Sequence, residues 1–148
     1  MHADTATQPH HETKTPPVAP TRKRAILLVE DDLDMVHFLK SLLATLDNCQ
    51  VIHATDGRTA NEFLRVGEVD LVLTDILMPE MDGMEVIRHV RETRGELPVI
   101  AMTGGGRRLP GLDLVRYAEL LGADKAVSKP INPQALLMLL NDLLPTLQ

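Results

Sequence analysis

The chain has 148 residues, a net charge of −6, 44% hydrophobic residues and 2% aromatic residues. Its length predicts a single domain. Its acidic charge and its shortage of aromatic side chains argue against nucleic acid as the main partner, because nucleic-acid binders need a basic face or stacking platforms. The single cysteine, Cys49, excludes an internal disulfide and a multi-cysteine zinc site, and it favours a reduced, cytoplasmic protein.

Residues 1–24 differ from the rest of the chain. They contain four of the ten prolines and almost no large apolar residue, so we expect a disordered tail, followed by one folded domain over residues 25–148. We expect no signal peptide and no membrane insertion, because no stretch of the chain is apolar enough for either. The tail carries a net charge of +2 and the remainder −8. The basic run 22–24 is interpreted as a solvated lead-in to the first strand, with contact to an acidic partner or to lipid headgroups as the alternative.

From residue 25 onward, short apolar runs alternate with segments of helical periodicity. Buried strands are predicted at residues 25–29, 50–54, 69–74, 97–102 and 125–128. The first two predicted helices run from Leu33 to Leu46 and from Gly57 to Val66. A third begins at a cap at Asp82, a fourth ends at about Leu121, and a last helix begins at Asn132-Pro133. Five strand–helix units in a row predict an α/β fold, in which helices cover both faces of a doubly wound, five-stranded parallel sheet.

Ligands of such folds bind beyond the carboxyl ends of the strands, so the residues at these ends form the candidate site. They are Glu30, Asp31 and Asp32 after the first strand, Asp75 after the third, Thr103 after the fourth and Lys129 after the fifth. Each of these acids alone could be a helix cap, and the lysine alone could be a solvated side chain. Together they predict one site. Carboxylates about 4 Å apart repel by roughly 4 kcal/mol at an effective dielectric constant near 20, so this group requires a cation.

The combination of residue types suits phosphoryl transfer. Hard carboxylate oxygens favour Mg²⁺, which keeps open coordination positions for phosphate oxygens. Lys129 offers a positive charge to an incoming phosphoryl group, and the Thr103 hydroxyl offers a hydrogen bond. One carboxylate can then act as the nucleophile and form an acyl phosphate.

Four segments at these strand ends resemble the receiver domain of two-component response regulators. They are residues 26–32 (ILLVEDD), 75–83 (DILMPEMDG), 102–104 (MTG) and 129–130 (KP). The resemblance runs from about residue 24 to residue 144, and its D-x-x-M-P-x-x-D-G stretch is highly specific. It implies a flavodoxin-like sheet with strand order 2-1-3-4-5.

The resemblance also implies a role for each matching residue. Asp75 matches the phospho-acceptor, and Thr103 and Lys129 match the residues that bind the phosphoryl group and switch with it. The implied Mg²⁺ ligands are Glu30, Asp31, Asp75 and the backbone carbonyl of Leu77. Within the acidic pair, Asp31 is the expected direct ligand. Family members often hold the matching lysine–proline peptide bond in cis, so we expect the same of Lys129–Pro130.

One departure from the family pattern concerns the switch. Many receivers carry Tyr or Phe three residues before the lysine, and the ring turns inward when the threonine moves. Ala126 stands at that position here. Tyr117 either replaces the missing ring or simply packs in the core or on the surface.

Two further departures lie near the expected phosphoryl group. The segment over residues 104–111 looks longer than in minimal receivers, and its Gly104, Gly105 and Arg107 either belong to an anion-binding lid or form a surface loop. Leu77 and Gly105 occupy positions that control access of hydrolytic water in the family. Because both are non-polar, slow-to-moderate self-dephosphorylation is expected.

The resulting hypothesis is a stand-alone phospho-acceptor rather than an enzyme in the usual sense. It receives a phosphoryl group on Asp75 from a histidine kinase or phosphotransfer protein, and it signals through the face formed by the fourth helix, fifth strand and fifth helix. The resemblance also allows a homodimer. Because the chain ends four residues after Leu144, we expect no output domain and no direct binding of nucleic acid.

Two alternatives belong to other functional classes. A degenerate receiver would act as a binding scaffold without phosphorylation, which Ala126 favours and the intact set of site residues opposes. A phosphatase of the haloacid dehalogenase type also uses a strand-end aspartate, but it needs a second aspartate two residues later, where this chain has Leu77.

Overall fold

The structure is a computed structural model that describes residues 22–76, 83–104 and 113–144. Its strands are β1 (Arg24–Val29), β2 (Cys49–Ala54), β3 (Leu71–Asp75), β4 (Val99–Thr103) and β5 (Lys125–Ser128). Its helices are α1 (Leu33–Leu43), α2 (Gly57–Val66), α3 (Gly83–Thr93), α4 (Leu114–Leu121) and α5 (Pro133–Leu143). This order confirms the predicted alternation. Residues 22–24, which the sequence assigns to the tail, are instead part of the described structure, because Arg22 donates hydrogen bonds to Asp70 and Arg24 begins β1. Residues 1–21 of the predicted tail, the predicted Asp82 cap and most of the glycine-rich segment lie outside the described residues.

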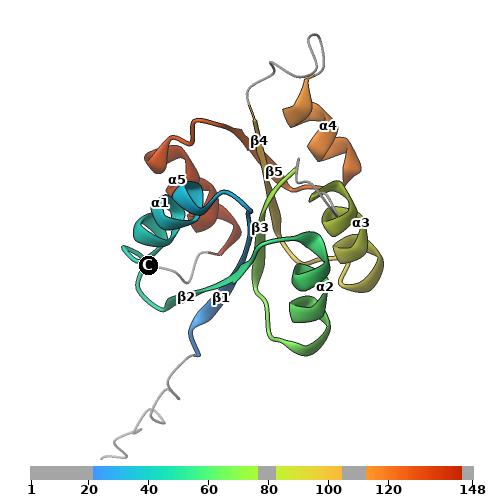
Figure 1. Ribbon diagram of the computed structural model, residues 1–148, viewed down its shortest axis with the longest axis horizontal. Coiled ribbons are helices and arrows are strands. Elements are labelled where there is room, and N and C mark those ends of the chain that lie inside the picture. Colours follow the sequence, from blue (N-terminus) through green and yellow to red (C-terminus); the bar gives the residue numbers. More distant parts are fainter. Residues whose placement is uncertain (1–21, 77–82, 105–112, 145–148) are drawn as a thin grey trace, which may run out of the picture.

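The five strands are parallel and lie in the order β2-β1-β3-β4-β5, which confirms the predicted fold and topology. Helices α1 and α5 cover one face of the sheet, and α2, α3 and α4 cover the other (Figure 1). The central strands β1, β3 and β4 are buried almost throughout. Because both of their faces are covered, their sequences are mostly apolar rather than alternating between apolar and polar residues. In the described part of the chain, no helix has the length and apolar character that a membrane span requires.

Local signals in the sequence set most helix ends. The side chains of Asp32, Asp56 and Asn132 accept hydrogen bonds from backbone N–H groups in the first turns of α1, α2 and α5. Gly122 ends α4 with φ at +117°, in the left-handed region that glycine adopts without strain. Asp113 begins α4 as its N-cap, a start that the sequence pattern does not single out.

The two central strands β3 and β4 begin two residues later and end one residue later than predicted. Asp75 pairs with Met102, and Thr103 pairs with Ser128, so both site residues are the last residues of their strands instead of the first residues after them. Their backbones are therefore fixed by the sheet, which leaves only their side chains to adjust at its edge.

Helix α1 ends at Leu43, three residues before the predicted end. The chain tightens after this point, because the Thr45 hydroxyl donates a 2.7 Å hydrogen bond to the Leu42 carbonyl and the next N–H groups bond three residues back.

Candidate functional site

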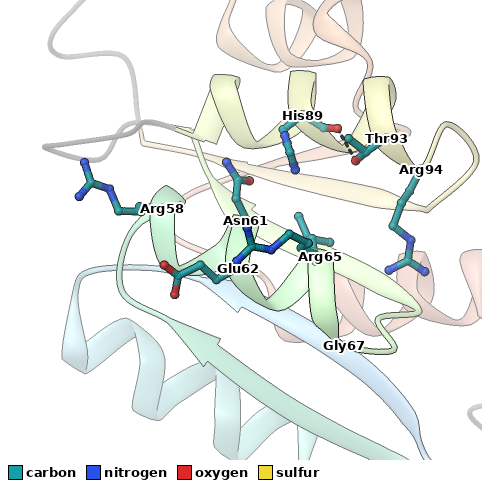
Figure 2. A pocket seen from close by; sticks show the side chains of 9 residues that line it. Arg58, Asn61, Glu62, Arg65, Gly67, His89, Thr93 and Arg94 are labelled. Carbon is teal, nitrogen blue, oxygen red and sulfur yellow. Dashed lines mark hydrogen bonds between the residues drawn. The ribbon is translucent and has the colours of Figure 1, made fainter.

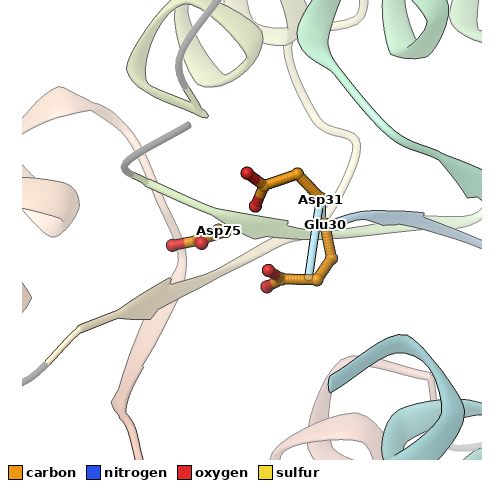
Figure 3. A group of neighbouring side chains, drawn as sticks. All are labelled: Glu30, Asp31 and Asp75. Carbon is orange, nitrogen blue, oxygen red and sulfur yellow. The ribbon is translucent and has the colours of Figure 1, made fainter. Parts of the chain in front are cut away.

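Three carboxylates meet at the carboxyl ends of β1 and β3 (Figure 3). Glu30 and Asp31 directly follow β1, Asp75 ends β3, and the two strands are neighbours in the sheet. One carboxylate oxygen from each residue lies within 4.8 Å of the others. Glu30 is fully buried, Asp75 is 6% exposed and Asp31 is open to solvent. The fold thus brings together the acidic group that the sequence predicts.

Lys129, the residue directly after β5, joins this acidic group. Its Nζ lies 3.0 Å from Oε2 of Glu30 and 3.0 Å from Oδ2 of Asp75. The lysine side chain is only 20% exposed, so solvent and salt screen these ion pairs less than they would screen surface pairs. One ammonium group therefore bridges two carboxylates that otherwise repel each other.

Burial and charge shift the pKa values of this pair. Burial raises the pKa of the Glu30 carboxyl above its ordinary value, and the hydrogen bond from Lys129 opposes this only in part. Burial would lower the pKa of Lys129, but its hydrogen bonds and charge interactions with Glu30 and Asp75 outweigh burial, and its pKa is raised. The lysine is therefore cationic at neutral pH. Since one ammonium faces three carboxylates, the site favours a second cation.

The donor set fits a hard divalent cation such as Mg²⁺, which binds through a few carboxylate oxygens and keeps part of its water. Both carboxylate oxygens of Glu30 already accept hydrogen bonds, one from the backbone N–H of Asp32 at 3.1 Å and one from Lys129. Asp31 is exposed beside them. This difference makes Asp31 better placed than Glu30 for direct contact with a cation that arrives from solvent.

Strand β2 holds the backbone of Glu30. The Glu30 N–H donates to the Ala54 carbonyl at 3.1 Å, and Nε2 of His53 donates to the Glu30 carbonyl at 2.9 Å. The first bond fixes the peptide group that precedes Glu30, and the second fixes the peptide group that links Glu30 to Asp31. His53 is not predictable from the sequence, because its position beside Glu30 depends on the register between β1 and β2, which no local pattern reveals.

Gly83, the first residue of α3, packs directly against the end of β3. Its N–H donates to the Ile76 carbonyl at 2.8 Å, and a Cβ atom at this position would overlap the backbone carbonyl of Asp75. Only glycine allows α3 to approach Asp75 this closely. The contact gives a physical reason for the glycine that ends the D-x-x-M-P-x-x-D-G stretch.

Thr103 connects the end of β4 to β5. It is 3% exposed, its Oγ1 donates to the Val127 carbonyl at 3.3 Å, and its own carbonyl accepts from the Lys129 N–H at 2.7 Å. The Lys129–Pro130 peptide bond is cis, as predicted. Thr103 therefore lies at the same edge of the sheet as the acidic group and is linked to Lys129 through the backbone.

The remaining predicted positions are less informative. Ala126 is half-buried and packs against the core beneath α2, α3 and α4, while Tyr117 is 38% exposed on α4. Gly104 is half-buried after Thr103. Leu77, Gly105 and Arg107 lie outside the described residues.

Comparison with known proteins agrees with this geometry. The family model described as "Response regulator receiver domain" matches residues 26–141. Over 111 residues the chain is 39% identical to the transcriptional regulatory protein CpxR of Escherichia coli K12, which covers 75% of this chain and 45% of CpxR. It is 29% identical to the response regulator SaeR of Staphylococcus aureus USA300, over 80% of this chain and 50% of SaeR. The chain thus spans about half the length of the curated relatives it matches.

Solved structures show the same fold. The signal receiver domain of an HD domain-containing protein from Pseudomonas fluorescens Pf-5 superposes with a TM-score of 0.75 at 29% identity, covering 86% of this chain and 91% of that chain. The receiver domain of a DNA-binding response regulator from Colwellia psychrerythraea 34H gives a TM-score of 0.73 at 28% identity, covering 83% and 99%.

Proposed function

Since the chain belongs to the response regulator receiver domain family, we propose that Asp75 accepts a phosphoryl group from a phosphohistidine of a histidine kinase or phosphotransfer protein. The observation that carries the proposal is the meeting of Glu30, Asp31, Asp75 and Lys129 at one edge of the sheet. A carboxylate nucleophile, an acidic pair and an ammonium group are the parts that phosphoryl transfer to an aspartate requires.

In the proposed reaction, a carboxylate oxygen of Asp75 attacks the phosphorus atom of the donor. The new O–P bond forms as the N–P bond of the phosphohistidine breaks, and the electron pair of that bond returns to the imidazole nitrogen. The Lys129 ammonium, now 3.0 Å from Asp75, is placed to pair with the phosphoryl oxygens. The Thr103 hydroxyl is proposed to exchange its Val127 partner for a phosphoryl oxygen.

We propose that Mg²⁺ is the cofactor, held by Asp31, Asp75, Glu30 and the backbone carbonyl of Leu77. When bound, it neutralises negative charge between the acceptor carboxylate and the phosphoryl oxygens. Glu30 acts chiefly by holding Lys129 and the Asp32 backbone, the two contacts that its oxygens already make. Gly104, Gly105 and Arg107 are proposed to contribute to anion binding. The phosphorylated form is proposed to hydrolyse slowly.

The output is proposed to be a change in protein–protein contacts on the face formed by α4, β5 and α5. Among the described side chains of its two helices, the exposed large apolar ones are Tyr117, Leu120 and Met138. Such a surface suits a downstream protein target or a homodimer. We further propose that the chain acts as a single-domain regulator in the cytoplasm, and that it neither binds nucleic acid directly nor inserts into a membrane.

Phosphorylation can be tested with Mg²⁺ and acetyl phosphate, a small donor whose acyl C–O–P linkage releases acetate. We expect an acid-stable, base-labile adduct on the natural chain, detected by intact mass. Asp75→Asn should carry none, whereas Asp142→Asn, which changes an exposed acid of α5, should be labelled normally. Labelling of Asp75→Asn, or no labelling of the natural chain by acetyl phosphate or a cognate kinase, would contradict the proposal.

One observation favours a second candidate, a binding scaffold that works without phosphorylation. Ala126 leaves the usual switch position without an aromatic ring. Beryllofluoride with Mg²⁺ mimics the aspartyl phosphate, so it separates the candidates. Partner affinity that changes with beryllofluoride supports the phospho-acceptor, and affinity that stays constant supports the scaffold.

A further inference from the structure

A groove between α2 and α3 lies outside the acidic site and carries charge of the opposite sign. Its volume is about 690 Å³, and its lining includes Arg58, Arg65 and Arg94 but only one acidic residue, Glu62. Residues 25–148 contain 11 basic and 19 acidic residues. A groove with three arginines is therefore a local exception on an acidic domain.

The arginines are distributed along the groove rather than gathered at one point. Figure 2 shows Arg58 near one end and Arg94 near the other, with Asn61 of α2 and His89 of α3 pointing toward each other between them. Arg58 and Arg65 are seven residues apart on α2, which corresponds to about 10 Å along the helix. An extended peptide covers that distance with about three residues.

Helix stability does not explain all of these arginines. Arg65 lies in the last turn of α2, where a cation interacts favourably with the helix dipole. Arg58 lies in the first turn, where a cation is unfavourable and where α2 has no acidic residue. Asp56, the N-cap, interacts with the charge of Arg58. Among the described residues, however, neither Arg58 nor Arg65 forms a salt bridge.

We propose that the α2–α3 groove binds an acidic segment of a partner protein, an extended stretch with two or more Asp or Glu side chains. Arg58 and Arg65 are exposed, so each contact is solvent-screened and individually weak. A small phosphorylated ligand would instead need buried donors focused on one anion. The acidic surface elsewhere repels such a segment, and this repulsion directs it to the groove. This binding is separate from phosphorylation of Asp75.

The proposal can be tested with a fluorophore-labelled hexaglutamate peptide, using hexaglutamine as the neutral control, by fluorescence anisotropy. We expect a dissociation constant on the order of 100 µM in low salt, binding that weakens at least fivefold in about 0.5 M NaCl, and no binding of hexaglutamine. The double variant Arg58→Glu with Arg65→Glu should weaken binding at least tenfold. The milder pair Arg58→Gln with Arg65→Gln should weaken it about threefold. Arg116→Glu reverses an exposed arginine on α4 and should leave affinity within about twofold.

Both double variants should keep the far-UV circular dichroism spectrum and the urea unfolding midpoint of the natural chain, which shows that they fold and does not depend on the proposed phosphorylation of Asp75. The inference would be overturned by no peptide binding at about 1 mM, by an equal loss of affinity in Arg116→Glu, or by equal binding of hexaglutamine. Displacement of the peptide by ADP or pyrophosphate at lower concentrations than by unlabelled peptide would show a small-anion site instead, and would also overturn it.

Discussion

His53 donates a 2.9 Å hydrogen bond from Nε2 to the backbone carbonyl of Glu30. This bond joins the end of β2 to the peptide group that carries both members of the acidic pair. Because the Asp31 side chain is exposed, its position depends on the backbone that carries it. The His53 contact is a way for β2 to hold that backbone.

We therefore expect His53→Ala to weaken Mg²⁺ binding by about fivefold, the effect of losing one hydrogen bond of about 1 kcal/mol. The measurement is the Mg²⁺ concentration that half-saturates phosphorylation by acetyl phosphate. His53→Gln can still donate to the carbonyl and should recover most of the affinity. If Ala and Gln behave alike, the hydrogen bond does not position the acidic pair.

Gly83→Ala should destabilise the protein by at least about 2 kcal/mol, because the new methyl group overlaps the Asp75 carbonyl and α3 must move away from β3. Phosphorylation should slow in parallel, since Asp75 moves with this contact. Urea unfolding measures the first effect. Gly95→Ala is the matched control: among the described residues its added Cβ meets just the Arg91 carbonyl oxygen, at 3.7 Å, an ordinary contact, so its stability should stay close to that of the natural chain.

Arg91 ties together the edge of the domain opposite the acidic site. Its guanidinium donates to the carbonyls of Gly122, Gly95 and Leu97 and to the carboxylate of Asp124, at 2.7 to 3.0 Å. Arg91→Met should lower the free energy of unfolding by about 2–3 kcal/mol, because several acceptors lose their partner. Arg88→Met, three residues earlier and exposed on the same helix, should cost less than about 0.5 kcal/mol. A comparable loss in both variants would argue against this network.

The sequence predicts the acidic site well because a parallel sheet places the carboxyl ends of all its strands at one edge. Once strand ends are located, Glu30, Asp31, Asp75 and Lys129 must lie at one edge of the sheet, and the repulsion among the carboxylates points to a cation. Long-range contacts are different. Nothing local distinguishes Arg91 from Arg88, or identifies His53 as the partner of Glu30, because each depends on the positions of loops and strands that are distant in sequence.

Two glycines also differ in how well the sequence predicts their structural role. Gly122 is predictable as a helix cap, because its left-handed conformation is a local property of the chain. Gly83 is recognisable only as part of a motif. The reason for it, its close approach to Asp75, becomes visible only when α3 is packed against β3.

Asp70 should make stability depend on pH in acid. It accepts two 2.7 Å hydrogen bonds from Arg22 and one of 2.8 Å from the Ala25 N–H, and the hydrogen bond from Arg22 is the main reason that its pKa lies below the ordinary 3.8. A carboxyl with a lower pKa in the folded state adds stability above its unfolded pKa, and this stability is lost as pH falls through the folded value. We therefore expect Asp70→Asn to be less stable at pH 7 and to lose less stability below pH 3.8 than the natural chain.

Urea titrations at several pH values measure the slope of the unfolding free energy against pH. An unchanged acid slope would contradict the assignment, and Asp47→Asn, at an exposed acid, should leave it unchanged.

Mg²⁺ should stabilise the folded chain through Asp31. A ligand that binds only the folded state at 100 times its dissociation constant adds about 2.7 kcal/mol, so the thermal midpoint should rise with Mg²⁺ concentration and fall again when EDTA is added. Asp31→Asn removes an exposed carboxylate of the acidic group, so it should leave the stability of the metal-free protein nearly unchanged while abolishing most of the Mg²⁺ response. Asp34→Asn, an exposed acid three residues later, should keep the full response. Because a nonspecific effect of the cation on an acidic protein would act on both variants equally, an equal response in the two would remove Asp31 from the metal site.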